Sequence, residues 1–189
     1  FVGASSRGAL DNSALIDIGG GSTEITVIEN GVDVARTSLP QGSLSSYKRF
    51  VSDILPTQNE ISAIRASVRR LIAADKTGAC AGSASELYGV GGSIRALSEV
   101  NAWLVPGASS EEITRDDVNR MLRDVVEQRR TFIDAVLHVS PERIHTIVCG
   151  LAILVEVFDE LDGERLRICD RGVREGYLIE HMLGELKSK

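Results

Sequence analysis

Two turns near the start of the chain constrain its fold more than any other feature. The stretch from residue 13 to residue 39, SALIDIGGGSTEITVIENGVDVARTSL, separates three short apolar-rich runs by the turns GGG and NG. Asn-Gly is a strong hairpin signal because both residues tolerate a positive φ. We therefore predict three consecutive antiparallel strands, over residues 13–18, 23–28 and 32–39.

Helix signals dominate the remainder of the sequence. Thr57 and Glu60 have the spacing of a capping box, and apolar residues recur after them at helical intervals to about residue 74. Thr114 and Asp117 repeat that spacing before a second amphipathic run. Both pairs predict the first turn of a helix.

Another helix is predicted by Ser140-Pro141, because a hydroxyl residue followed by proline is typical of a helix start. The run from 144 to 161 is almost entirely apolar, so we expect this helix to be buried on most sides. Short strands are expected at 86–90 and 165–169, and a final helix at 173–186.

The predicted order of elements is β-β-β-α-β-α-β-α with further helices. That order is typical of a ribonuclease-H-like α/β domain, in which a hairpin meander is followed by strands that return in parallel through right-handed helical crossovers. We therefore expect a mixed five-stranded sheet with flanking helices.

Composition restricts the classes of function. The chain has 189 residues and a formal net charge of −6, which argues against a surface devoted to nucleic acid or to anionic lipid. No apolar run approaches the roughly 18 residues of a membrane span, so we expect neither DNA nor a membrane as a partner. The cysteines Cys80, Cys149 and Cys169 form no CxxC pair, which predicts reduced thiols in a cytoplasmic protein. Because the first methionine is Met121, we also expect sequence upstream of these residues.

The first glycine turn has the composition of a phosphate-binding loop. Asp17 ends the first strand, and glycines and then hydroxyl residues follow it: Gly19, Gly20, Gly21, Ser22 and Thr23. Backbone N–H groups with no side chains above them fit the oxygens of a phosphate, and hydroxyls add donors. A carboxylate repels phosphate, so Asp17 is better suited to hold a divalent cation or a water beside it. Glu24 could share that task, unless the alternation of the strand turns it to the other face of the sheet.

A second glycine turn consists of Gly91, Gly92 and Ser93, between the predicted strand at 86–90 and a helix over about 94–101. The free N–H groups and the dipole of a helix N-terminus attract anions, and Arg95 could reach the same anion. Neither turn is a Walker A loop or a GxGxxG motif, because no lysine follows the first and neither has the third glycine. Without an anion to bind, the two turns would be an ordinary hairpin turn and a close-packed helix cap.

Five segments occur in the order seen in a known family: ALIDIGGGSTEITVIENG, TSLPQGS, ELYGVGGSIRAL, SPERIHTIVCGLAIL and ICDRGVREGYL. From about residue 9 to about residue 183, the sequence resembles the exopolyphosphatase and guanosine-pentaphosphate phosphohydrolase family. That family belongs to the superfamily of actin, Hsp70 and the sugar kinases, and its minimal members have two ribonuclease-H-like lobes with a phosphate site between them. The resemblance implies that residues 1–172 are the second lobe and that the first lobe, with the catalytic glutamate, lies upstream.

The resemblance also assigns roles to matched positions in this chain. Asp17 and Glu24 match the acids near a Mg²⁺ ion, and the two glycine turns match the family's phosphate loops. No residue of this chain matches the family's catalytic base. One departure is Ser45-Ser46-Tyr47-Lys48, which stands where many relatives have Arg-Leu-Thr-Glu, so that arginine has no counterpart here.

The activity implied by the resemblance is release of terminal phosphate from inorganic polyphosphate or from guanosine pentaphosphate (pppGpp), which present the same terminal phosphoanhydride. Two other classes stay open, namely an ATP-dependent phosphotransferase lobe and a module that senses phosphate compounds without turnover. The apolar stripe within 173–189 predicts a helix that packs on the first lobe or, in its absence, a homodimer. Arg171 and Arg174 are further cations that a polyanion would attract.

Overall fold

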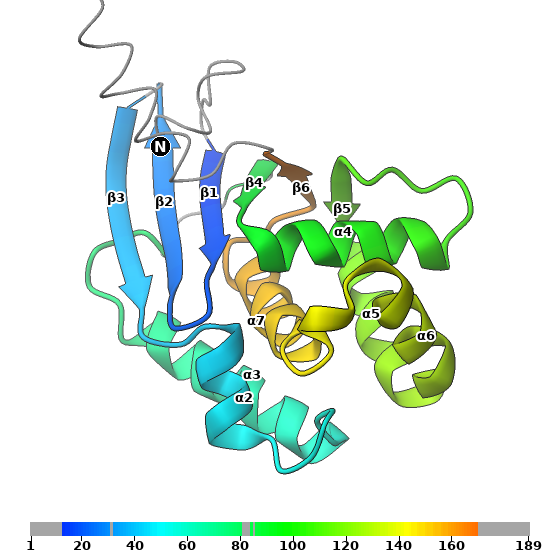
Figure 1. The fold of residues 1–189 in the computed structure, drawn as a ribbon. Coiled ribbons are helices and arrows are strands. Elements are labelled where there is room, and N and C mark those ends of the chain that lie inside the picture. The colour runs from blue at the N-terminus through cyan, green and yellow to red at the C-terminus, as the bar shows by residue number, and fades with distance from the viewer. Residues whose placement is uncertain (1–12, 31, 81–83, 85, 170–189) are drawn as a thin grey trace, which may run out of the picture.

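The computed structural model of the protein describes residues 13–30, 32–80, 84 and 86–169. Its centre is a six-stranded sheet in the order β3-β2-β1-β4-β6-β5, shown in Figure 1. The strands are β1 (Ser13–Ile18), β2 (Thr23–Glu29), β3 (Val32–Leu39), β4 (Glu86–Val90), β5 (Glu112–Thr114) and β6 (Arg165–Ile168). All five predicted strands are confirmed, with ends that differ by at most one residue.

The strand pairing is that of a ribonuclease-H-like domain. β1 pairs antiparallel with β2 and β2 pairs antiparallel with β3, whereas β1 with β4 and β4 with β6 are parallel. The predicted mixed sheet is therefore confirmed, but the prediction of five strands was one strand short. The additional strand is β5, which pairs antiparallel with β6 at the edge of the sheet. With three residues, it is too short to show the alternation that predicts a strand.

The helices pack against one face of this sheet. They are α2 (Ser43–Phe50), α3 (Gln58–Ala73), α4 (Gly92–Leu104), α5 (Arg115–Glu127), α6 (Arg129–Val139), the short 3₁₀ helix η1 (Pro141–Arg143) and α7 (Ile147–Glu160). α3 and α5 begin at the two predicted capping boxes. Helix α2 was not predicted, because it has only eight residues and its buried residues are Ser43 and Ser46, although Tyr47 and Phe50 also pack against the core.

One predicted helix start was placed wrongly. Ser140-Pro141 begins η1, whose backbone bond from Arg143 N–H to the Ser140 carbonyl is 2.9 Å long, and α7 begins only at Ile147. Hydrogen bonds between residues i and i+3 define a 3₁₀ helix, which is tighter than an α-helix and seldom longer than a few residues. The apolar run is nevertheless a buried helix, because every residue of α7 from Ile147 to Phe158 is buried.

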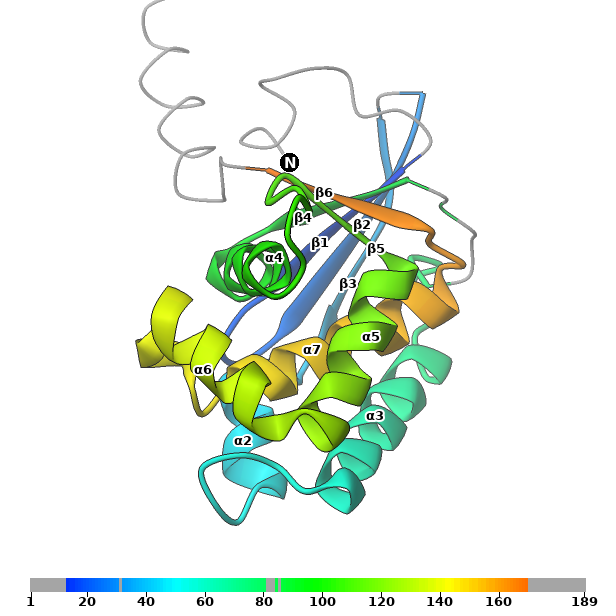
Figure 2. The same cartoon turned by 90° about the vertical axis from the view of Figure 1, so that its right-hand side faces the viewer.

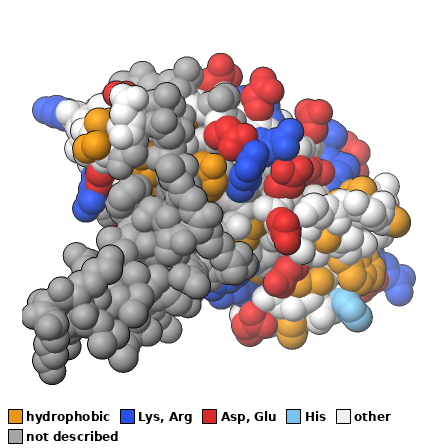
Figure 3. Space-filling model, turned by 90° about the horizontal axis from the view of Figure 1, so that it is seen from above, with side chains coloured by type: hydrophobic (Ala, Val, Ile, Leu, Met, Phe, Trp, Pro, Cys, Tyr) orange, Lys and Arg blue, Asp and Glu red, His pale blue; other side chains and the backbone are white. Residues whose placement is uncertain are grey.

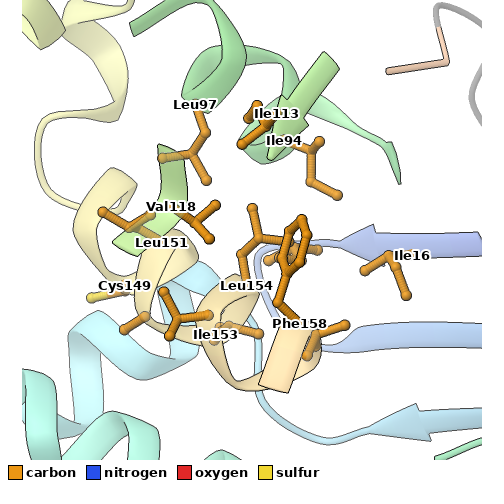
Figure 4. Packing of buried hydrophobic residues seen from close by; sticks show 14 of the residues in the cluster. Ile16, Ile94, Leu97, Ile113, Val118, Cys149, Leu151, Ile153, Leu154 and Phe158 are labelled. Carbon is orange, nitrogen blue, oxygen red and sulfur yellow. The ribbon is translucent and has the colours of Figure 1, made fainter. Parts of the chain in front are cut away.

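Helix α7 passes through the centre of the core. Figure 4 shows its side chains Leu154 and Phe158 lying among Ile16 of β1 and Ile94 of α4. A helix that packs against a sheet and against other helices must be apolar all round, which explains the composition of this segment.

The two faces of the sheet have different neighbours. Ile16 and Ile18 of β1 belong to the main core cluster with the helices, and in Figure 2 the helices lie together on this side of the sheet. Leu15 is one residue out of phase and belongs to a smaller cluster with Val90 on the opposite face. Asp17 has the phase of Leu15, so its side chain leaves β1 on the face away from the helix layer.

One charged residue, Glu156, lies in the buried part of α7. Glu156 is fully buried, and its carboxylate accepts hydrogen bonds from Arg65 Nε at 2.5 Å and from Arg69 Nε at 3.0 Å. A buried carboxylate is tolerated where guanidinium groups pair with it. Since both arginines lie on α3, these ion pairs fix α3 against α7.

The surface carries charges of both signs. On the face seen from above in Figure 3, acidic and basic side chains are interspersed. Ion pairs cross from β6 to its two neighbours, with Arg167 at 3.1 Å from Glu86 and Arg165 at 3.2 Å from Glu112. In the part of the chain that the structure describes, no helix is long and apolar enough to span a membrane.

Two of the cysteines are free thiols in apolar surroundings. Burial raises the pKa of Cys149 to about 12 and the pKa of Cys80 to about 11. Both side chains therefore stay protonated at neutral pH and act as small apolar groups. The predicted helix at 173–186, Arg171 and Arg174 lie outside the described residues.

The Glu60 carboxylate at the start of α3 gives a pH-dependent contribution to stability. Its pKa lies at about 2, below the ordinary value of 4.5, chiefly because it accepts a hydrogen bond from the backbone N–H of Thr57. The lowered pKa means that this contribution is complete above pH 4.5 and is lost as the pH falls toward 2. We expect Glu60→Ala to lower the free energy of unfolding by about 1 kcal/mol at neutral pH, and by progressively less in acid.

Urea unfolding of both proteins across this pH range measures the difference. Glu99→Ala on the exposed side of α4 is the matched control and should leave the free energy of unfolding nearly unchanged. A Glu60→Ala effect that stayed constant down to the lowest pH would show that the charged capping box is not its cause.

Candidate functional site

The two glycine turns meet at one end of the sheet. β1 and β4 are parallel neighbours with Asp17 opposite Val90, so the residues that follow these strands lie side by side. Gly91 adopts a φ of 89°, and a Cβ atom there would lie 2.5 Å from Asp17 Oδ1. Glycine is therefore required at position 91 both by its left-handed backbone and by the Asp17 carboxylate beside it.

Asp17 and Glu24 lie on the same face of the sheet. The antiparallel register of β1 and β2 pairs these two residues directly, and directly paired residues point to the same side. The alternative that strand alternation separates them is therefore wrong. Glu24 Oε1 accepts hydrogen bonds from the hydroxyls of Ser22 at 2.5 Å and Ser38 at 3.0 Å, which hold it at the mouth of the turn.

The electrostatics of this pair favour a cation. Burial and, next, the negative charge of Glu24 raise the pKa of Asp17, while the positive charge of Arg95 acts in the opposite direction. Two carboxylates that repel one another supply the oxygen ligands that Mg²⁺ prefers. Among the described residues no group of three metal-ligating side chains occurs, so water and phosphate oxygens would complete the coordination of an ion held by Asp17 and Glu24.

The orientation of the first glycine turn is fixed by α2. The carbonyl of Gly19 accepts from the Ser43 N–H at 2.9 Å, and the carbonyl of Gly20 accepts from the Ser45 N–H at 2.8 Å. The carbonyls of the turn thus point at the N-terminus of α2. Within the described part of the chain, the N–H groups of Gly20, Gly21 and Ser22 donate no hydrogen bond, so they are available to an anion.

Close packing, and not an unusual φ, explains the glycine at position 42, next to the first turn. None of the three glycines in the first turn adopts a left-handed φ. Gly42 has a φ of −123°, which any residue can adopt, but a Cβ atom there would lie 2.7 Å from both Gly20 C and Ser22 N. The turn therefore rests on the backbone of Gly42.

This contact leads to a prediction for Gly42→Ala. The added methyl group meets backbone atoms that have no side-chain freedom to move away, so we expect the free energy of unfolding to fall by about 2 kcal/mol. We also expect weaker binding of pyrophosphate, because the turn must shift. Gly21→Ala is the control for stability alone, since nothing lies within 4 Å of a Cβ atom at Gly21.

Urea unfolding and calorimetric titration with pyrophosphate measure the two effects. Equal stability of the Gly42→Ala and Gly21→Ala variants would contradict the close contact between Gly42 and the turn.

Two of the predicted phosphate ligands lie in the layer beneath the turn. Thr23 is fully buried and donates its hydroxyl to the Gln41 carbonyl at 2.8 Å, so that hydrogen is not available to a phosphate, in contrast to the prediction. Ser93 is also buried, and its hydroxyl lies 3.4 Å from Ser43 Oγ. The hydroxyl of Ser22 bonds to Glu24. The turn's available donors are therefore its backbone amides.

Arg143 is a site residue that the sequence analysis did not single out. It lies on η1, and its guanidinium group occupies the space in front of the Gly92 α-carbon, where a Cβ atom would overlap it. Gly91 has no side chain to cap the N-terminus of α4, and Arg143 lies beside the first helix amides, for which no acceptor is found among the described residues. Arg143 is the last residue of the segment SPER, but nothing in that segment alone shows that its side chain lies beside Gly92.

The fold and this site define the class of protein. A ribonuclease-H-like sheet whose β1–β2 turn and β4–α4 turn converge is characteristic of the superfamily of actin, Hsp70 and the sugar kinases, and this chain has that fold. The sequence profile of the Ppx/GppA phosphatase family matches residues 2–185, and the chain belongs to this family.

Curated relatives share this sequence over part of their length. The guanosine-5'-triphosphate,3'-diphosphate pyrophosphatase of Photobacterium profundum is 28% identical over 180 residues, which make up 95% of this chain and 35% of that protein. The protein of the same name from Aeromonas salmonicida is 24% identical over 173 residues, or 92% of this chain and 34% of that protein. The chain thus spans about a third of the length of these relatives.

Solved structures share the fold. The PPX-GPPA enzyme of Aquifex aeolicus superposes with a TM-score of 0.76 at 20% identity, covering 95% of this chain and 60% of that one. An exopolyphosphatase from Cytophaga hutchinsonii superposes with a TM-score of 0.74 at 16% identity, covering 92% of this chain and 58% of that one.

Proposed function

We propose that this chain is the phosphate- and metal-binding lobe of a two-lobed hydrolase of phosphoanhydrides. The observation that carries this proposal is the convergence of two sets of available backbone amides on one carboxylate, Asp17. Amides of the first turn lie on one side of Asp17, and the N-terminus of α4 lies on the other. An anion bound to both sets would be held next to a cation site.

The residues of this lobe would bind and orient the terminal phosphate. The amides of Gly20, Gly21 and Ser22 would bind its oxygens, and Arg143 would add a charged donor beside Gly92. Asp17 and Glu24 would hold Mg²⁺, which when bound supplies positive charge against the phosphoryl oxygens. We assign the general base that activates water to the first lobe, in line with the family resemblance.

The preferred substrate in this proposal is inorganic polyphosphate, because a linear polyanion can be bound entirely by amides, arginines and a cation. A second candidate is pppGpp, which is favoured by the names of the curated relatives. Both end in the same phosphoanhydride, so the residues described above would serve either of them.

Steady-state hydrolysis by a protein that carries both lobes tests the proposal and separates the candidates. We expect Mg²⁺-dependent phosphate release with a higher kcat/KM on polyphosphate than on pppGpp. A higher kcat/KM on pppGpp than on polyphosphate would identify pppGpp as the preferred substrate. No release from either compound, together with tight binding of one of them, would favour a sensing module, and phosphate transfer from ATP would favour a phosphotransferase.

A further inference from the structure

We propose that Gln41 is a positioning residue for the candidate phosphate loop, the turn from Gly19 to Ser22. This inference goes beyond ligand contacts and rests on the proposed function only in calling the loop a phosphate site. Gln41 lies between β3 and α2, is 4% exposed, and is a polar side chain in the interior. Burying a side-chain amide costs free energy unless its polar atoms form hydrogen bonds in the interior.

Both polar atoms of the Gln41 side chain are hydrogen-bonded. Its Nε2 donates to Ser46 Oγ at 3.1 Å and to the Ile64 carbonyl at 3.4 Å, and its Oε1 accepts from Ser67 Oγ at 2.7 Å. The Ile64 carbonyl is only an acceptor, which fixes the orientation of the amide group. Gln41 thereby connects α2, through Ser46, with two positions on α3.

The backbone of Gln41 extends the network to the loop. Its carbonyl accepts the hydroxyl of Thr23 at 2.8 Å, at the point where the loop enters β2. The next residue is Gly42, on whose backbone the loop rests. A shift of Gln41 would therefore move both the floor of the loop and the start of α2.

The start of α2 in turn determines which way the loop faces. The N–H groups of Ser43 and Ser45 bind the carbonyls of Gly19 and Gly20. While these bonds persist, the loop carbonyls point inward and the remaining loop amides point outward, toward an incoming anion. Since the Gln41 side chain joins α2 to α3, it fixes the helix that makes these bonds.

A geometric reason favours an amide over an apolar residue here. Apolar packing is non-directional, whereas two donated bonds and one accepted bond set the position and the rotation of the segment together. A phosphate loop depends on the direction of a few N–H groups, so small rotations of its support change its affinity.

The test separates positioning from stability by removing the network in two ways. Gln41→Met alone leaves the hydroxyls of Ser46 and Ser67 buried without their partner. The triple variant Gln41→Met, Ser46→Ala, Ser67→Ala removes the polar groups together, which restores most of the lost stability. Gln58→Met and Ser62→Ala are matched controls at exposed positions of α3.

The first measurement is amide hydrogen exchange of Ser43 and Ser45, expressed relative to core amides of α7, so that a change in global stability cancels. We expect these two amides to exchange at least about tenfold faster than wild type in the triple variant. The second measurement is calorimetric titration of a protein carrying both lobes with pyrophosphate, for which we expect a dissociation constant raised about three- to tenfold.

Each outcome decides one question. Unchanged relative exchange at Ser43 and Ser45 in the triple variant would overturn the positioning role of Gln41. Faster exchange in a protein whose wild type binds no pyrophosphate would support the role of Gln41 and reject the phosphate site. Faster exchange at both amides with weaker pyrophosphate binding, and neither effect in the controls, is the expected result.

Discussion

Asp17→Asn is expected to lower the turnover of a protein carrying both lobes by roughly 10²-fold or more, the scale of a lost electrostatic contribution to the transition state. The substitution keeps the shape of the side chain beside Gly91 and removes the negative charge that would hold Mg²⁺. It also removes the repulsion by Glu24 that contributes to the raised pKa of Asp17. The folded protein should therefore be at least as stable as wild type.

This combination of lost activity and retained stability distinguishes a site residue from a structural one. Steady-state kinetics over a range of Mg²⁺ concentrations and urea unfolding measure the two quantities on the same preparation. Asp33→Asn is the matched control, because Asp33 also lies in the hairpin meander but is ion-paired with Arg36. An unchanged Mg²⁺-dependent rate in Asp17→Asn would remove Asp17 from the metal site.

The 189-residue chain by itself is expected to be nearly inactive. A general base must lie within hydrogen-bond reach of the attacking water, and a phosphate must be held in a defined orientation to react. The described residues supply one loop, one helix N-terminus and two acids that we assign to the metal. Because the chain supplies only part of the groups that would hold phosphate, it should bind phosphate with a dissociation constant in the millimolar range or above. This corresponds to a binding free energy of only about 4 kcal/mol.

Phosphate release from polyphosphate with Mg²⁺, by this chain and by a two-lobed protein at equal concentration, measures the difference. Far-UV circular dichroism and a cooperative urea transition verify that the chain is folded during the assay. A rate within about tenfold of the two-lobed protein would place the base within these residues and contradict the proposed division between lobes.

Local sequence signals correctly predicted five of the six strands and the first turns of two helices. β1, β2 and β3 follow from apolar-rich runs and the turn residues between them, and α3 and α5 start at the predicted capping boxes. These features depend on residues within a few positions of one another, so the order of residues is enough to reveal them. The two glycine turns also lie where the sequence placed them, between β1 and β2 and before α4, and their binding of phosphate stays a prediction.

Elements without a local signal were missed or displaced. Helix α2 has serines at its two buried positions, and β5 is held by its pairing with β6. The helix start predicted at Ser140-Pro141 was displaced, because these residues begin η1 and the buried helix begins only at Ile147. The partners that hold α2 and β5 are distant in the chain.

The sequence by itself determined the order of most elements along the chain, the mixed character of the sheet and the buried helix, and it located the two glycine turns. Only the tertiary structure decided how those turns are used: it put Glu24 on the face of Asp17, brought Arg143 to Gly92, and enclosed Thr23 beneath the loop. The hydrogen bonds that support the loop join residues far apart in the sequence, with 18 positions between Thr23 and Gln41 and 23 between Gln41 and Ile64. The physical reason is that hydrogen-bond direction and close packing depend on the distance between atoms in space, and residue order specifies that distance only for near neighbours.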